Sequence, residues 1–186
     1  TYTQDYRDLL RFREAKAGLQ EAGVETSLGA YPDLSRFDAI ILSPGVDPSQ
    51  GPVARAAASG VLVLPELELG ALAAKGRIVC ITGTKGKSTT TVSLHAMLRE
   101  AGFDARAVGN IGDPITAHVD GSDERTVFVT EASSFQLETT RNFRPDCAVF
   151  LNLFADHLDR HPGFEAYAAA KARIFVNQTE DDAAIV

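Results

Sequence analysis

Cysteine is scarce in this chain: only two occur in 186 residues, and both lie in apolar runs typical of strands. Cys80 falls within the run from Ile78 to Ile81, and Cys147 opens the run that ends at Leu153. Neither has a neighbouring histidine that could activate its thiol. We therefore expect two reduced thiols that act as small buried hydrophobes in a cytosolic protein.

Long hydrophobic runs and an excess of positive charge are also missing. No stretch reaches the roughly 18 consecutive apolar residues of a membrane span, so the sequence predicts no membrane insertion. The net charge of −7 and the lack of a basic stripe argue against a nucleic-acid partner. The polar start at Thr1–Asp5 is unlike a signal peptide, and because it lacks Met we expect a trimmed N-terminus.

The composition that is present, 45% hydrophobic and 23% charged, is that of a globular protein. Short apolar runs alternate with helical patterns, which predicts an α/β fold with a parallel sheet. Strands are expected at 38–42, 61–64, 77–81, 105–108, 126–130, 147–153 and 182–186. Helices are expected at 5–22, 53–59, 66–75, 88–101 and 164–177. A domain boundary near Gly76 divides the chain into 1–76 and 77–186, and we expect both parts to be truncated.

The most informative segment is a Gly-rich turn between an apolar strand and a helix. Its residues Gly83, Thr84, Lys85 and Gly86 would let backbone N–H groups approach phosphates, beside a helix N-terminus. Lys87 would reach the β- and γ-phosphates, and the hydroxyl of Ser88 or Thr89 would hold Mg²⁺. The general pattern G-x-x-x-x-G-K-[ST] has Gly where this chain has Ile81. An ordinary strand-to-helix turn is therefore the alternative.

Two further side chains follow predicted buried strands, where ligands collect in open α/β sheets. Glu131, one strand away from the Gly-rich turn, is a candidate Mg²⁺ ligand, with a solvated carboxylate as the alternative. His157 is a candidate for a metal or substrate contact. His157 and His161 have the i,i+4 spacing of a helical metal pair, but Pro162-Gly163 directly afterwards argues against a regular helix there.

Lys171 stands out because it lies in an apolar stripe of a predicted helix. The residues expected on its face are Phe164, Tyr167, Ala168, Ile174 and Phe175. A lysine in such a stripe must snorkel, pair or lose its charge. Snorkelling is the ordinary interpretation. The alternative is a neutral amine that takes up CO₂ to become a carbamate, an anion able to bind Mg²⁺.

Three polar segments at strand ends are candidates for substrate contacts. Ser133 and Gln136 lie just past Glu131, in a segment that could equally be a capped turn. Asn110 lies in a tight loop between two glycines, where Asn is often only a turn residue. The turn Ser43-Pro44-Gly45 has the corresponding place in the first domain.

Together these segments resemble the Mur ligases, a family of ATP-dependent amide-bond-forming enzymes of peptidoglycan precursor synthesis. Thr82–Thr89 is similar to the family's T-G-T-N-G-K-S-T, which accounts for Ile81. Glu131–Glu138 is similar to E-L-S-S-F-Q-L-E, a sequence specific to the member that joins D-glutamate to UDP-N-acetylmuramoyl-L-alanine. The segment 156–160 resembles D-H-M-D-R, and 167–174 resembles Y-x-x-A-K-x-R-I.

The resemblance implies an α/β fold with a partial Rossmann-like N-terminal domain, followed by a truncated P-loop-type, mostly parallel central ATPase domain. It implies ATP and Mg²⁺ as cofactors, with ATP bound at Gly83–Thr89. The implied catalytic residues are Lys87, His157 and Lys171. The implied Mg²⁺ ligands are Ser88, Glu131, His157 and carbamylated Lys171. The implied substrate contacts are Ser43, Pro44, Gly45, Asn110, Ser133 and Gln136, with Asp5 and Arg7 as weaker candidates.

The implied reaction uses ATP to convert the substrate carboxylate to an acyl phosphate, which the amine of D-glutamate then attacks. We expect a monomer. Two features depart from the family's pattern: Lys85 replaces the usual Asn, and we expect the given sequence to lack the family's third domain. The alternatives are another Mur-type or folylpolyglutamate-type ligase, or a nucleotide-binding module without ligase activity. A GTPase-like switch is disfavoured, because the chain has no N-K-x-D sequence.

Overall fold

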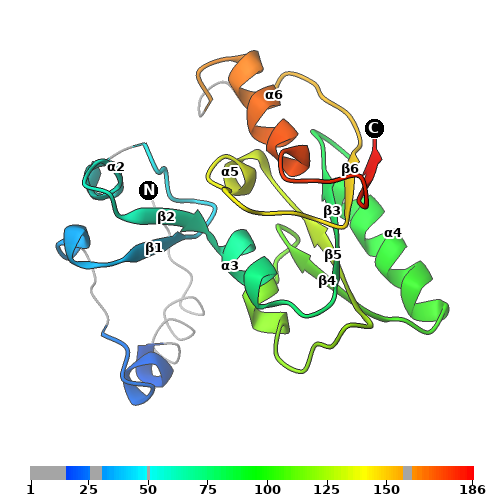
Figure 1. The fold of residues 1–186 in the computed structure, drawn as a ribbon, viewed down its shortest axis with the longest axis horizontal. Helices are drawn as coiled ribbons and strands as arrows, with labels where there is room; N and C mark the ends of the chain where they lie inside the picture. Colours follow the sequence, from blue (N-terminus) through cyan, green and yellow to red (C-terminus); the bar gives the residue numbers. More distant parts are fainter. Residues whose placement is uncertain (1–15, 26–30, 50, 157–160) are drawn as a thin grey trace, which may run out of the picture.

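A computed structural model describes residues 16–25, 31–49, 51–156 and 161–186. Two parallel sheets of unequal size lie side by side, with one helix between them (Figure 1). The small sheet pairs β1 (Ala39–Leu42) with β2 (Leu62–Pro65), and α2 (Gly51–Ala58) connects the two strands. Helix α3 (Glu66–Ala73) then leads into the larger sheet.

The larger sheet has the strand order β4-β5-β3-β6-β7, and every pairing in it is parallel. Its strands are β3 (Arg77–Thr82), β4 (Asp104–Gly109), β5 (Thr126–Glu131), β6 (Cys147–Phe150) and β7 (Ala183–Ile185). The helices are α4 (Lys87–Glu100), α5 (Ser134–Leu137) and α6 (Phe164–Ala172), with short 3₁₀ turns η1 (Leu34–Arg36), η2 (Ile115–His118) and η3 (Arg173–Phe175). The loop after β3 lies at the carboxyl end of the central strand. From β3 the chain crosses to β4 on one side of the sheet, and it later returns to β6 on the other side, so this loop lies at the point where ligands bind in open α/β sheets.

Both faces of the large sheet are covered, which is why its strands read as continuous apolar runs. Helix α4 packs across β3, β4 and β5. The buried core joins Ile78, Cys80, Phe128 and Ala148 from the strands with Leu67 from α3 and Ile174 from η3. The predicted α/β fold with a parallel sheet is therefore confirmed.

Two carboxylates fasten α3 to the larger sheet. Glu68 is buried and accepts the backbone N–H groups of Arg141 at 2.6 Å and Asn142 at 2.7 Å. Glu66 accepts the N–H and hydroxyl of Thr116 at 2.8 and 2.7 Å. The placement of the domain boundary near Gly76 stays a prediction, but this helix packs against η2, and its Leu67 joins the core of the larger sheet.

Several element boundaries differ from the sequence-based expectation. The strand expected at 147–153 ends at Phe150, because the chain then turns towards the loop after β3. The helix expected at 164–177 ends at Ala172 and continues as η3, where the side chain of Arg173 donates to the carbonyls of Leu137 and Thr140. The short elements η2 and α5 were not predicted. Of the helix expected at 5–22, the structure describes 16–21 as helical.

The expectation of two buried thiols is half wrong. Both cysteines are free, and burial raises the pKa of each thiol. Cys80 is fully buried in the middle of β3, whereas Cys147 is only half-buried because it begins β6 at the end of the sheet. Among the described residues, no helix is both long and apolar enough to cross a membrane.

Candidate functional site

The loop between β3 and α4 has the form of an anion cradle. It runs from Gly83 to Gly86, between the end of β3 at Thr82 and the start of α4 at Lys87. Gly86 has a φ of 85°, in the left-handed region that glycine enters without strain. This turn places the N-terminus of α4 at the carboxyl end of β3. The first N–H groups of a helix have no intrahelical partner and favour negative charge.

Two lysines hold carbonyl oxygens of this loop. Nζ of Lys171 donates to the carbonyl of Gly83 at 2.8 Å, and Nζ of Lys87 donates to the carbonyl of Thr84 at 3.0 Å. Carbonyl oxygens carry partial negative charge and would repel phosphates. Because these two already accept hydrogen bonds from side-chain nitrogens, the loop is arranged for a polyanion.

A third side chain, which the sequence interpretation missed, also holds the loop. The carboxamide of Asn152 accepts the N–H groups of Thr84 and Lys85 and donates to the carbonyl of Lys85. The sequence contained a signal for this role, because Asn152 closely follows the apolar run of β6, at the carboxyl end of that strand. In a parallel sheet such a position lies at the ligand-binding edge.

Lys171 is buried beneath the loop, with 1% of its surface exposed, so the snorkelling interpretation is wrong. Its Nζ also lies 3.4 Å from the hydroxyl of Thr82 and 4.9 Å from the ring centre of Tyr167. Burial, followed by the charge of Lys87, lowers the pKa of Lys171 from 10.5 to about 8. Phe164, expected on the same helical face, is instead exposed because it begins α6.

Glu131 has a buried carboxylate, one oxygen of which has no hydrogen-bond partner among the described residues. Its Oε1 accepts a hydrogen bond from Nδ2 of Asn110 at 2.7 Å. Its Oε2 is buried without any partner among the described residues, although only 1% of Glu131 is exposed. An orphaned buried carboxylate oxygen is costly unless a cation binds it. The donor type therefore fits Mg²⁺.

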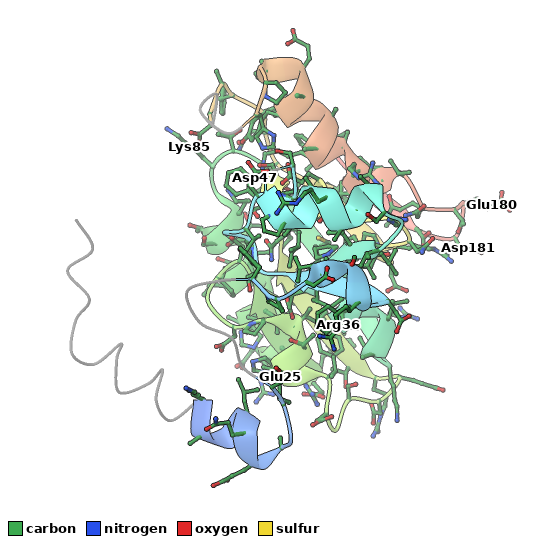
Figure 2. The ribbon with its side chains drawn as sticks, turned by 90° about the vertical axis from the view of Figure 1, so that its left-hand side faces the viewer. Glu25, Arg36, Asp47, Lys85, Glu180 and Asp181 are labelled. Atoms are coloured by element: carbon green, nitrogen blue, oxygen red, sulfur yellow. The ribbon has the colours of Figure 1, made fainter. Side chains whose placement is uncertain are left out.

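No group of three His, Cys, Asp or Glu side chains in the described part of the chain could hold a metal ion by itself. A Mg²⁺ ion at Glu131 would therefore also need hydroxyl, phosphate or water ligands. Ser88 and Thr89 are exposed on the first turn of α4, as such a role requires. The side chain of Lys85 is exposed at the periphery of the molecule (Figure 2).

A pocket of about 300 Å³ brings together several of the predicted substrate contacts from both sheets. It is lined by Ser43, Pro44, Glu66, Gly109, Asn110, Gly112, Pro114 and Gln136. Asn110 is positioned there by Glu131, which holds both its side chain and its backbone N–H. Glu131 thus holds a residue of the pocket wall, and it lies at the end of the strand next to β3, which leads into the phosphate loop. Gly45 adjoins this pocket in sequence but does not line it.

Ser133 and Gln136 form a capping box at the start of α5. The Ser133 hydroxyl accepts the N–H of Gln136 at 3.3 Å, and Oε1 of Gln136 accepts the N–H of Ser133 at 3.0 Å. The capped-turn interpretation is therefore correct for both. Gln136 nevertheless lines the pocket, so the substrate role of these two residues stays a prediction.

The histidines cannot be compared as a pair. His161 is buried, with Nε2 3.0 Å from the hydroxyl of Ser134 and its ring stacked on Phe135. His157 lies outside the described residues, as do Asp5 and Arg7. Their predicted roles therefore stay predictions.

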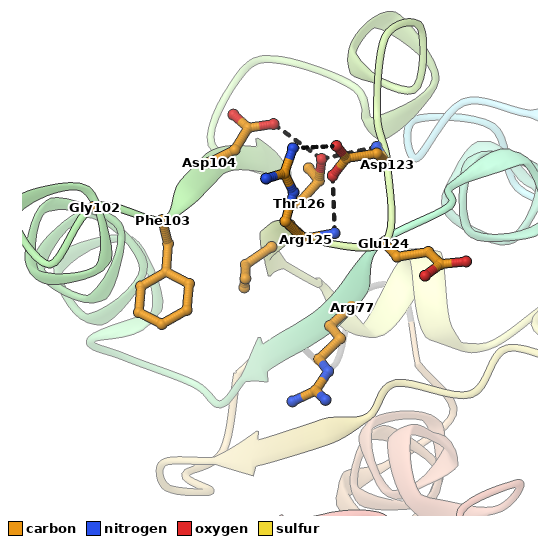
Figure 3. A pocket seen from close by; sticks show the side chains of 9 residues that line it. Arg77, Gly102, Phe103, Asp104, Asp123, Glu124, Arg125 and Thr126 are labelled. Atoms are coloured by element: carbon orange, nitrogen blue, oxygen red, sulfur yellow. Dashed lines mark hydrogen bonds and ion pairs between the residues drawn. The ribbon is translucent and has the colours of Figure 1, made fainter.

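A further hollow lies far from this chemistry. It measures about 680 Å³ and lies at the N-terminal ends of β3, β4 and β5, opposite the phosphate loop (Figure 3). Four of its polar side chains are bonded in pairs: the Thr126 hydroxyl donates to Asp104 at 2.9 Å, and Arg125 pairs with Asp123 at 3.2 Å. None of the predicted site residues lines this hollow.

The parallel sheet, the Gly-rich loop after its central strand and the buried lysine and carboxylate beside that loop define a P-loop-type α/β protein. Residues 81–186 match the family model of the Mur ligase middle domain. The chain therefore belongs to the Mur ligase family.

Curated relatives of the chain are UDP-N-acetylmuramoylalanine–D-glutamate ligases. That of Pelotomaculum thermopropionicum is 45% identical over 170 residues, which cover 90% of this chain and 37% of the relative. That of Acidobacterium capsulatum has the same identity and the same coverage. The chain thus spans well under half of the length of these relatives.

Solved structures show the same fold. The MurF ligase of Thermotoga maritima in complex with ADP aligns with a TM-score of 0.50 at 16% identity, covering 83% of this chain and 46% of that one. The UDP-N-acetylmuramate:L-alanyl-γ-D-glutamyl-meso-diaminopimelate ligase of Neisseria meningitides aligns with a TM-score of 0.55 at 16% identity, covering 90% of this chain and 58% of that one.

Proposed function

We propose that the full-length protein containing this chain is an ATP-dependent ligase that joins D-glutamate to UDP-N-acetylmuramoyl-L-alanine. The observation that carries the proposal is the position of Glu131 between two sites. Its strand lies next to the phosphate loop, and its carboxylate holds Asn110 on the wall of the 300 Å³ pocket. A nucleotide and a second substrate would therefore meet at this carboxylate. The named relatives at 45% identity support this choice of substrates.

The proposed reaction has two steps. An oxygen of the alanyl carboxylate attacks the γ-phosphorus of ATP, ADP leaves, and an acyl phosphate forms. The amine of D-glutamate then attacks the acyl carbon, loses a proton, and inorganic phosphate leaves. Two anions approach each other in the first step, so positive charge at the loop must offset their repulsion. Lys87, together with the N–H groups at the start of α4, supplies such charge.

Mg²⁺ belongs to this proposal because Oε2 of Glu131 has no other partner among the described residues. Glu131 and Ser88 would hold the ion, which would neutralise charge on the phosphates. The protein's own part is to keep the carboxylate buried and aimed, through the hydrogen bond from Asn110.

Carbamylation of Lys171 is a further part of the proposal. A neutral amine is needed to react with CO₂, and the buried position of Lys171 favours the neutral form. The N–H that remains after carbamylation can still donate to the carbonyl of Gly83. In the proposed enzyme the carbamate of Lys171 and His157 would hold a second Mg²⁺, separate from the one at Glu131.

The test is phosphate release by the full-length protein with ATP, Mg²⁺ and UDP-N-acetylmuramoyl-L-alanine, with D-glutamate compared against other amino acids. Release that requires D-glutamate is the expected result. Release with a different amino acid would assign another ligase of the family. No release with any amino acid, despite nucleotide binding, would reduce the chain to a nucleotide-binding module. Cytosolic location and a monomeric state complete the proposal, and gel filtration of the full-length protein tests the latter.

A further inference from the structure

The side chain of Asn152 is hydrogen-bonded to both backbone polar groups of Lys85 in the phosphate loop, its N–H and its carbonyl. Its Oδ1 accepts the N–H of Lys85 at 3.0 Å and the N–H of Thr84 at 3.2 Å. Its Nδ2 donates to the carbonyl of Lys85 at 3.0 Å. The orientation of the carboxamide is fixed by this set of partners, because the flipped amide would set an NH₂ group against two N–H donors.

The sheet register explains why Asn152 reaches the loop. Thr82 pairs with Phe150 in the parallel ladder of β3 and β6, and the N–H of Leu151 extends the ladder to the carbonyl of Thr82. Asn152 therefore lies beside Thr84, whose N–H also bonds the backbone carbonyl of Asn152 at 3.0 Å. A Cβ atom at Gly83 would come within 3.1–3.3 Å of Leu151 and Asn152, so the two chains approach closely.

We propose that Asn152 is a positioning residue of the ATP site, which fixes the Lys85 peptide so that phosphates bind only the N–H groups from Gly86 to Thr89. This inference rests on the proposed function. With the N–H groups of Thr84 and Lys85 held by Asn152, the donors that face an anion are those at the start of α4. The carbonyl of Lys85 is held away from the anion by the same side chain.

Asn152 completes a set of three donors with different chemistry. The carbonyls of Gly83 and Thr84 are held by Lys171 and Lys87, whose side-chain nitrogens are also close to each other. The carbonyl of Lys85 accepts instead from a neutral amide, which adds no charge beside the two lysines. The amide of Asn152 is hydrogen-bonded only to the backbone of Lys85, and the side chain of Lys85 is exposed. The identity of residue 85 therefore matters little for the shape of the loop.

The first experiment measures ADP binding in the presence of Mg²⁺ by calorimetry, on the full-length protein and its Asn152→Ala variant. We expect the dissociation constant for ADP to rise about tenfold or more, because the loop loses three hydrogen bonds that fix it. We expect KM for ATP to rise while KM for the UDP-linked substrate stays constant. The matched control is Asn177→Ala, which removes an amide that donates to the carbonyls of Arg141 and Phe143 in the segment before β6. It should lower the melting temperature without weakening ADP binding.

Amide hydrogen exchange of the wild-type protein gives a test that needs no variant. We expect the N–H groups of Thr84 and Lys85 to be protected without nucleotide and unchanged by ADP, whereas Gly86–Thr89 gain protection. An Asn152→Ala variant that binds ADP as well as wild type, or more tightly, would overturn the inference, as would new ADP-dependent protection at Thr84 or Lys85. In that case a wild-type protein that still binds ADP and turns over leaves the proposed function intact. Failure of the wild type to bind ADP at all would overturn both.

Discussion

The amine of Lys171 lies 2.8 Å from the carbonyl oxygen of Gly83. This hydrogen bond connects the end of α6 to the phosphate loop, which lies 88 residues earlier in the chain. The lysine is buried, so its side chain contacts the loop from the interior of the protein. One side chain thus shapes the nucleotide cradle and also presents an amine close to the charges of Lys87, Asp156 and Glu131. This dual position makes Lys171 the most informative residue to change.

Replacing Lys171 with Ala should abolish turnover of the full-length protein. The variant loses both the donor to Gly83 and the proposed carbamate. If the carbamate supplies the missing function, a short carboxylic acid such as acetate should partly restore phosphate release. The control is Lys75→Ala, which changes an exposed lysine after α3 and should leave turnover unchanged. Wild-type turnover in Lys171→Ala would exclude both roles.

The pKa of Lys171 predicts a pH-dependent stability. In the unfolded chain the amine stays protonated up to its ordinary pKa of 10.5, whereas in the folded protein it releases its proton near 8. Between these pH values the unfolded state binds more protons, so the free energy of unfolding rises with pH. Compared with Lys171→Met in CO₂-free buffer, the wild type should therefore gain melting temperature as the pH rises from 8 towards 10.5. A difference in melting temperature that stays constant over this pH range would show that the pKa of Lys171 is not lowered by folding.

Removing the charge of two buried glutamates should affect two different properties: metal dependence at Glu131 and stability at Glu68. Glu131→Gln keeps an acceptor for Asn110 but removes the anionic oxygen that has no partner among the described residues. We expect no loss of stability and a Mg²⁺ requirement raised at least about tenfold in titrations of activity. Glu68→Gln weakens a carboxylate that holds two backbone N–H groups, and should lower the free energy of unfolding by about 1–3 kcal/mol without changing the Mg²⁺ requirement. A higher Mg²⁺ requirement in Glu68→Gln alone would contradict the assignment.

The sequence predicted the parts of the site that depend on local pattern. Continuous apolar runs predicted the strands, because a parallel sheet is covered on both faces. The spacing of Gly83, Gly86 and Lys87 predicted the phosphate loop, and a single lysine in an apolar stripe predicted an unusual Lys171. These signals need only neighbours in sequence or along one helix.

The missed features depend on which strands lie side by side. Asn152 acts on the loop only because β6 pairs with β3, and the order of strands in the sheet is not written in either segment. Glu68 likewise bonds N–H groups more than 70 residues away, so its spacing in α3 gave no warning of a buried carboxylate. Long-range register, rather than local propensity, therefore carries the part of the site that the sequence interpretation left out.

The turn that carries Asn110 gives a last prediction, because two of its glycines differ in their surroundings. Both have positive φ, 93° at Gly109 and 121° at Gly112, so an alanine at either position is strained by about 1–2 kcal/mol. A Cβ atom at Gly109 would also lie 2.2 Å from the carbonyl oxygen of Glu131, whereas one at Gly112 would meet nothing within 4 Å. Gly109→Ala should therefore destabilise the protein clearly more than Gly112→Ala in urea unfolding, and it should displace Asn110 from Glu131. Because that contact holds the pocket next to the phosphate loop, Gly109→Ala should also raise KM for the UDP-linked substrate. Equal effects of the two variants would mean that the close approach of the two backbones does not position Asn110.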